Sequence, residues 1–281
     1  MRDTRPDIGA FVALGDSFTE GVGDPYPHGT GDRGPDHPGL CYRGWADRFA
    51  ERLAAERLAA DRPGLRYANL AVRGRLVGQV AADQVPLAVA MAPDLVSIAA
   101  GGNDLLRPRA DPDALAQAFD VAIAQLRAAS REVLVFTGFD PRTFPFIRLI
   151  RGKVAAYNMH LRVIADRRDC RLVDLWSMRV LGDPREWAPD RLHLGPDGHR
   201  RVALRACEVM GVSVDEDWRE PLPPRLSPEA VRSQAAVAWI AARRLDAHWA
   251  REYAAPWVGR RLRRVSTGDG VVPKRPEMLP L

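Results

Sequence analysis

The chain has 281 residues, 46% hydrophobic and 27% charged, which is ordinary for a globular protein with one large domain or one domain plus an appendage. Its net charge is +5, but only Lys153 and Lys274 are lysines, so the excess of arginine reflects a GC-rich genome better than it indicates a nucleic-acid surface. No apolar run approaches the roughly 20 residues that span a bilayer and no signal-peptide core is present, so we expect a cytoplasmic protein without stable membrane association.

Short apolar runs alternate with longer helical patterns along most of the chain. In order, the predicted strands are Ala10–Leu14, Tyr67–Val72, Asp94–Ala99, Glu132–Gly138 and Arg171–Leu175. The predicted helices are about Gly44–Ala60, Leu76–Met91, one that begins at Asp111-Pro112, Phe146–Arg167 and Pro196–Met210. Near-continuous apolar strands suit a sheet covered on both faces, and the alternation implies parallel βαβ units. We therefore predict a three-layer α/β domain.

The pattern changes after the last of these helices. Around Asp215–Pro224 acidic residues give way to prolines, and Ser227-Pro228-Glu229 then opens a helix with a narrow apolar stripe. From Pro256 onward the chain is rich in arginine and then punctuated by Pro and Gly. We predict a main domain over residues 1–213. An extension over 214–281 would contain a linker, an amphipathic helix docked on that domain or on a partner, and a poorly ordered tail.

The first chemical signal is a serine that directly follows the first predicted strand, in Gly15-Asp16-Ser17-Phe18. Open α/β sheets bind ligands at the carboxyl ends of their strands, which is where Ser17 lies. Gly15 permits a sharp turn, and the serine N–H can face a developing oxyanion. A serine that caps a helix after a strand is equally consistent with this motif taken alone.

The second signal is an aspartate and a histidine in Asp190-Arg191-Leu192-His193, just ahead of the last helix of the main domain. Three residues apart on a loop, the carboxylate can accept the Nδ1–H of the imidazole. This contact fixes the tautomer and stabilises the imidazolium that forms when Nε2 takes a serine proton. Taken alone, the pair is better explained as a surface contact without a role.

Two further motifs, Asn69–Gly74 and Gly101–Asp104, each follow a predicted strand and should emerge at the same sheet edge as Ser17. Gly74 can offer an unobstructed backbone N–H, and Asn103 can offer a side-chain amide. With the N–H of Ser17 they would form an oxyanion hole of three donors. Each motif is individually also an ordinary strand-ending turn rich in Gly and Asn.

Together, the four motifs resemble the SGNH hydrolase family of bacterial GDSL-type esterases and lipases, over about Ile8–Gly211. Phe18 stands where the family name has leucine, at a position that does no chemistry. The matching residues are the nucleophile Ser17, the oxyanion residues Gly74 and Asn103, and the pair Asp190 and His193.

The resemblance implies a flavodoxin-like αβα sandwich, the SGNH hydrolase fold, with a parallel sheet of about five strands in order 2-1-3-4-5. It also implies a carboxylic-ester hydrolase with no cofactor and no metal, which acylates Ser17 and then passes the acyl group to water with His193 as base. The expected partner is a small-molecule ester, handled by an esterase, a deacetylase or a lysophospholipase. We expect no nucleic-acid partner.

Two other functions fit the same residues. An acyltransferase would use the same serine if its pocket favoured an alcohol over water. A non-catalytic binding module on an esterase-like scaffold would use the basic run Arg260–Arg264 in the C-terminal segment. The intact set of five motif residues argues against the binding module.

Other residues that could carry chemistry are better explained structurally. The histidines and aspartates of the loop Phe18–Leu40 match no metal-site spacing, so we expect them to be exposed. His199 lies inside a predicted helix without an aspartate three residues before it, which ranks it below His193 as a base. Aromatic residues after the fourth strand and before Asp190 could line an acyl pocket, but aromatics near strand ends more often belong to the core. These residues are His28, Asp32, Asp36 and His37 in the loop, and Phe139, Phe144, Phe146 and Trp187 among the aromatics.

Overall fold

The computed structural model describes residues 6–26, 42–144, 147–223, 251–252, 255, 259 and 266–281. The chain divides into two compact units, Met1–Arg219 with Gly270–Leu281, and Glu220–Asp269. The predicted helix after residue 227, the basic run 260–264, Phe146, and the loop residues 27–41 with their two histidines and two aspartates lie outside the described residues. The domain boundary at 213/214 stays a prediction.

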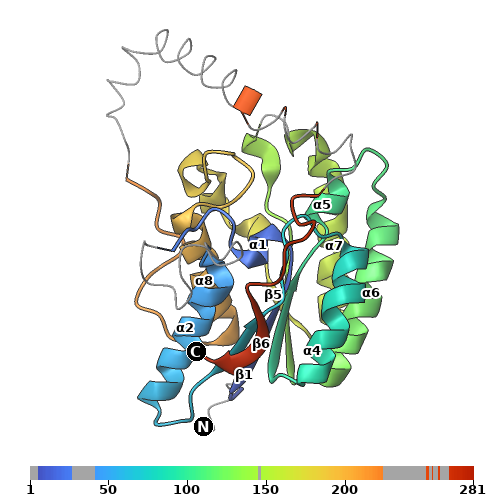
Figure 1. Cartoon of the computed structure of the whole chain (residues 1–281). Helices are drawn as coiled ribbons and strands as arrows, with labels where there is room; N and C mark the ends of the chain where they lie inside the picture. Colours follow the sequence, from blue (N-terminus) through green and yellow to red (C-terminus); the bar gives the residue numbers. More distant parts are fainter. Residues whose placement is uncertain are drawn as a thin grey trace. The chain divides into compact units, whose positions relative to one another are not determined.

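The first unit is a three-layer α/β fold around one sheet (Figure 1). Five parallel strands lie in the order β5-β4-β3-β1-β2, which confirms the predicted order and fold class, and β6 adds an antiparallel strand beside β2. The strands are β1 (Ala10–Gly15), β2 (Arg66–Asn69), β3 (Leu95–Ala99), β4 (Glu132–Phe136), β5 (Arg171–Val173) and β6 (Arg275–Pro280).

Helices cover both faces of this sheet (Figure 1). The helices are α1 (Ser17–Glu20), α2 (Gly44–Ala59), α3 (Val77–Gln79), α4 (Val85–Met91), α5 (Gly102–Leu105), α6 (Pro112–Ala129), α7 (Arg151–Arg167) and α8 (Pro196–Met210). A π-helical turn, Val80–Gln84, joins α3 to α4. Short 3₁₀ turns occupy Pro141–Thr143, Ile147–Ile150, Leu175–Ser177, Arg179–Gly182 and Pro184–Glu186.

The alternation of side chains along β1 explains why both faces are covered. Phe11 packs with α2 and α8 on one side, whereas Val12 and Leu14 pack with α4, α6 and α7 on the other. Every residue of β1 is buried, as expected for a strand between two helical layers. Because β1, β3 and β4 are parallel, their carboxyl ends lie at the same edge of the sheet, where Ser17 and Asn103 follow β1 and β3.

The tail prediction is wrong for residues 275–280, which form β6. Two prolines in Arg275–Pro280 made a strand improbable from the sequence, because proline cannot donate to a sheet ladder. β6 lies at the edge of the sheet, where proline is tolerated. Within the described residues, no helix has both the length and the apolar character of a membrane span.

Candidate active site

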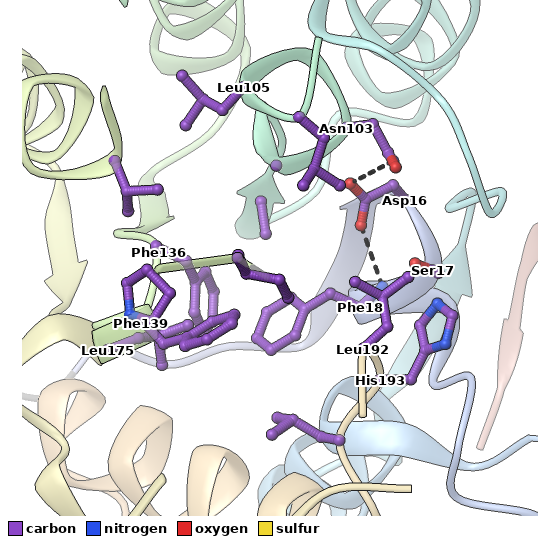
Figure 2. Close-up of a pocket in the computed structure, with 18 of the residues that line it drawn as sticks. Asp16, Ser17, Phe18, Asn103, Leu105, Phe136, Phe139, Leu175, Leu192 and His193 are labelled. Carbon is purple, nitrogen blue, oxygen red and sulfur yellow. Dashed lines mark hydrogen bonds between the residues drawn. The ribbon is translucent and has the colours of Figure 1, made fainter. Parts of the chain in front are cut away.

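A largely apolar cavity of about 190 Å³ opens where β1, β3 and β4 end (Figure 2). Ser17, Asn103 and His193 all line it, although they come from three distant parts of the chain. Asp190 is hydrogen-bonded to His193. Gly74 is not among the lining residues. The structure thus brings four of the five motif residues together and leaves the fifth in a neighbouring turn.

Ser17 is the first residue of α1, held by a sharp turn at the end of β1. Gly15 has φ 148°, and a Cβ there would lie 2.4 Å from the carbonyl oxygen of Ala99, so only glycine fits. The buried amide of Gln84 clamps the same glycine: its Oε1 accepts the Gly15 N–H at 2.8 Å and its Nε2 donates to the Gly15 carbonyl at 2.9 Å. Asp16 caps α1 by accepting the Phe18 N–H.

His193 is oriented by Asp190. The Oδ2 of Asp190 lies 2.6 Å from the imidazole Nδ1, while its Oδ1 accepts the backbone N–H groups of Leu192 and His193 at 3.0 Å each. Burial alone would raise the pKa of Asp190, but its hydrogen bonds and the nearby imidazole hold that pKa below its ordinary value. The carboxylate is therefore ionised at neutral pH and its Nδ1 partner carries a proton.

The loop that carries this pair is tightly built. Arg191 adopts φ 55°, a left-handed conformation that non-glycine residues rarely hold and that is common at functional sites. The Ala188 N–H donates to the His193 carbonyl at 2.9 Å, which closes the loop. Behind it, the buried guanidinium of Arg201 pairs with the carboxylate of Glu186 at 2.9 Å. These contacts fix the backbone from which the imidazole projects.

Asn103 reaches the pocket from the first turn of α5. Its amide nitrogen donates to Asp16 Oδ2 at 3.0 Å (Figure 2). It also donates to the Arg75 carbonyl at 3.1 Å. Burial raises the pKa of Asp16 to about 6, so this carboxyl is mostly ionised at neutral pH and accepts both Asn103 and the Phe18 N–H. Gly74 precedes Arg75 in the same turn and has φ 75°, which favours glycine.

His199 plays a structural part, as the sequence ranking of the two histidines predicts. It is fully buried on α8, its Nδ1 accepts the Trp45 N–H at 3.2 Å, and its Nε2 lies 3.2 Å from the Val22 carbonyl. Burial lowers the pKa of His199 to about 4, so it is neutral at pH 7. These contacts join the turn after α1 to α2 and α8.

The aromatic residues divide between pocket and core. Phe139 and Trp187 line the cavity, while Trp187 also belongs to the hydrophobic core and Phe139 packs against it, so these two residues serve both roles. Phe144 is buried and packs edge-on against both of their rings, at centroid distances of 5.7 and 4.7 Å, without lining the cavity. The sequence could not separate the two roles because all three residues are large, apolar and close to strand ends.

Sequence reasoning missed Gln84 and the role of Asp16. The sequence signal for Gln84 was a polar side chain next to Val85 in the predicted helix Leu76–Met91. Asp16 lies in the nucleophile motif, but its role as the cap of α1 and the acceptor of the Asn103 amide was not predicted. Within the described residues, no cluster of three histidine, cysteine or carboxylate side chains could hold a metal ion.

Comparison with known proteins places this fold and pocket in a class of enzymes. The model of the GDSL-like Lipase/Acylhydrolase family matches residues 13–201, which is more than half of the chain. The chain therefore belongs to this family and is a carboxylic-ester hydrolase. No curated protein sequence matches it.

Solved structures share the fold. LAE5, described as an alpha/beta hydrolase enzyme from the metagenome of Lake Arreo in Spain, is 24% identical with a TM-score of 0.58, over 73% of this chain and 95% of that one. A variant of Axe2, an acetyl xylan esterase from Geobacillus stearothermophilus, is 22% identical with a TM-score of 0.60, over 75% of this chain and 100% of that one.

Proposed function

We propose that the protein hydrolyses carboxylic esters through an acyl-enzyme on Ser17, with His193 as the base and Asp190 as the residue that orients it. The observation that carries the proposal is the Asp190–His193 pair, with 2.6 Å between Oδ2 and Nδ1, on the same pocket as Ser17. No hydrogen bond joins Ser17 to His193 in the described part of the chain. Such bonds are often long before substrate binds.

In this mechanism His193 Nε2 takes the Ser17 proton as Oγ attacks the ester carbonyl, and the imidazolium then gives that proton to the departing alkoxide. Water attacks the acyl-enzyme with His193 as base again, which releases the acid and restores Ser17. The oxyanion donors would be the Ser17 N–H, the Gly74 N–H and the Asn103 amide, which would exchange its bond to Asp16 or to the Arg75 carbonyl for one to the oxyanion. Two other Axe2 structures, described as catalytic mutants, carry alanine in place of a serine and of a histidine.

The pocket favours an apolar acyl group longer than acetyl. Its walls include Phe18, Phe139, Leu175 and Trp187, and its acidic and basic lining residues, Asp16 and His193, both lie beside Ser17. An acetyl group would leave most of the cavity unfilled. Each methylene buried against these walls contributes about 0.8 kcal/mol, or roughly a fourfold gain in kcat/KM, until the cavity is full.

The test is hydrolysis of p-nitrophenyl esters from acetate to long acyl chains. We expect kcat/KM to rise from acetate and to peak at a medium chain length. Ser17→Ala should lose nearly all turnover, whereas Ser177→Ala, which removes an exposed hydroxyl bonded to the Asp174 carbonyl, should keep it. Added alcohol in the assay separates transfer from hydrolysis. Equal rates for wild type and Ser17→Ala would refute the proposal.

A further inference from the structure

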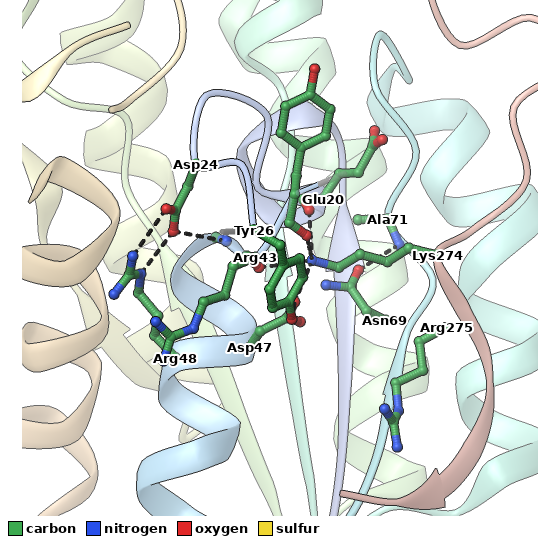
Figure 3. Close-up of polar contacts among 12 residues, drawn as sticks. Glu20, Asp24, Tyr26, Arg43, Asp47, Arg48, Asn69, Ala71, Lys274 and Arg275 are labelled. Atoms are coloured by element: carbon green, nitrogen blue, oxygen red, sulfur yellow. Dashed lines mark hydrogen bonds and ion pairs between the residues drawn. The ribbon is translucent and has the colours of Figure 1, made fainter. Parts of the chain in front are cut away.

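Lys274 lies in the C-terminal segment 270–281 and is buried beside α1, the helix that begins with Ser17. Its side chain is 3% exposed. Its Nζ donates to the carbonyl oxygens of Glu20, Tyr42 and Arg43 at 2.7, 3.0 and 2.8 Å, and to Asp47 Oδ2 at 2.8 Å (Figure 3). An ammonium has three protons, so this cage of four oxygens satisfies it fully. The cage joins the end of α1 to the start of α2.

The carboxylate of Asp47 anchors the cage from α2. Besides Lys274, it accepts the phenol hydroxyls of Tyr67 at 2.7 Å and Tyr26 at 2.9 Å. Burial, followed by the nearby Asp47 charge, raises the pKa of Tyr67 well above its ordinary value, so this phenol stays a donor. Lys274 and Asp47 thus form a buried ion pair whose remaining hydrogen-bonding capacity is filled, the arrangement in which such pairs are stable.

The helix that Lys274 contacts, α1, is too short to be stable without contacts from the rest of the fold. α1 has one turn, from Ser17 to Glu20, and isolated single turns are unstable because helix nucleation is unfavourable. Its last carbonyls have no helical partners. The Thr19 carbonyl accepts the Asn69 amide at 3.0 Å, and the Glu20 carbonyl accepts Lys274. A cation at this end also suits the helix dipole.

β6 delivers Lys274 to this place. The strand pairs antiparallel with β2, with Tyr67 opposite Leu279, and the Arg275 Nε donates to the Tyr67 carbonyl at 2.9 Å. Lys274 directly precedes the strand, so the pairing sets its position. It is one of two lysines among the 41 lysine and arginine residues of the chain. A compact ammonium fits a cage of oxygens on several sides, whereas a planar guanidinium does not.

We propose that Lys274 is a positioning residue for catalysis, which acts through the Glu20 carbonyl to hold α1 and its first residue, Ser17, against the oxyanion donors. The C-terminal segment 270–281 is then a working part of the active site. The proposal rests on the proposed role of Ser17 as nucleophile. A shift of about 1 Å in a reacting group can lower a rate about 100-fold.

The experiment compares Lys274→Met with Lys153→Met, which removes the other lysine, on α7, whose Nζ donates to the carbonyl oxygens of Arg107 and Pro108 and not to α1. A double variant, Lys274→Met with Asp47→Asn, leaves no unpaired buried charge and carries the test if the single variant fails to fold. For each we would measure kcat and KM on the best p-nitrophenyl ester, and amide hydrogen exchange at Gly21 and Val22, whose N–H groups bond to the Ser17 carbonyl.

The Lys274 variants should lose 10- to 100-fold in kcat with KM within about twofold, because the acyl pocket is untouched, and exchange at Gly21 and Val22 should quicken at least 10-fold. Lys153→Met should match wild type in both. Folded Lys274 variants with wild-type kcat and exchange would overturn the inference. The hydrogen-exchange result tests whether Lys274 positions α1 independently of the role of Ser17. If Ser17→Ala kept activity, the proposal that Ser17 is the nucleophile would be refuted, but the exchange result would still decide whether Lys274 holds α1.

Discussion

The contacts of Asp190 make a sharp prediction for Asp190→Asn. Oδ1 of the native carboxylate accepts two backbone N–H groups, from Leu192 and His193, while Oδ2 faces the imidazole Nδ1. In the variant, the amide oxygen must stay toward the two N–H donors, which places the NH₂ group against Nδ1. The imidazole must then carry its proton on Nε2, where it cannot take the Ser17 proton.

The size of the effect follows from the alternative orientation. Turning the asparagine amide over would leave two backbone N–H groups facing an NH₂ group, at about 1–2 kcal/mol each. The unproductive tautomer is therefore favoured by about 2–4 kcal/mol, which is roughly a 30- to 700-fold deficit in reactive enzyme. Loss of the negative charge that stabilises the imidazolium adds to this, for a fall in kcat of about 10³–10⁴.

The assay is kcat on a p-nitrophenyl ester together with ¹⁵N NMR of the His193 side chain. We expect the proton on Nδ1 in wild type and on Nε2 in Asp190→Asn. The matched control is Asp111→Asn, because Asp111 caps α6 through the Asp113 N–H and does not line the pocket. It should stay within twofold of wild type. A loss below tenfold in folded Asp190→Asn, or an unchanged tautomer, would refute the reasoning.

Three further substitutions test other parts of the site. Asn103→Ala should lower kcat about 10²–10³-fold with little change in KM, since an oxyanion donor acts in the transition state; equal losses in kcat and 1/KM would contradict this. Gly101→Ala should destabilise by about 2–4 kcal/mol in urea unfolding, because φ is 113° and the new Cβ would lie 2.6 Å from Tyr157 Cε1. Gly102→Ala, where the new Cβ would have no atom within 4 Å, should leave the free energy of unfolding nearly unchanged. Equal destabilisation by the two substitutions would contradict the steric explanation. For His199, whose pKa falls from 6.5 to about 4, the unfolded chain takes up the proton first, so stability should drop by about 3 kcal/mol between pH 6.5 and 4. His199→Gln should reduce this dependence of stability on pH, whereas His160→Gln, at an exposed histidine on α7, should leave it unchanged. An unchanged pH dependence in His199→Gln would contradict the burial argument.

The parallel sheet and the meeting of Ser17 and Asn103 at one of its edges could be predicted from the residue pattern, whereas the strand order and the meeting with His193 were implied by the resemblance to the SGNH hydrolase family. Buried strands can be recognised by their continuous apolar runs, and residues that directly follow parallel strands lie at the same edge of the sheet. The nearby pair Asp190 and His193 needs only a short loop to make contact. These features depend on local pattern and on the geometry of parallel sheets.

Features that depend on long-range pairing could not be predicted. The π-helical turn before α4 orients Gln84 toward Gly15, a partner 69 positions away, and no local signal distinguishes it from continuous helix. β6 exists because the edge of β2 offers unpaired backbone groups, and Lys274 finds its cage only once that pairing forms. Propensity alone assigns such a proline-containing segment to a tail.

The central claim is that Ser17 forms a covalent acyl intermediate. It is tested most directly by acid-quenching the enzyme during turnover of a p-nitrophenyl ester of the preferred chain length and measuring the mass of the protein and its peptides. We predict an increase equal to one acyl group on the peptide that contains Ser17, absent in Ser17→Ala and accumulated in Asp190→Asn only at a much lower rate. Turnover that depends on Ser17 with no acyl group on that peptide, or an acyl group on another residue, would contradict the account.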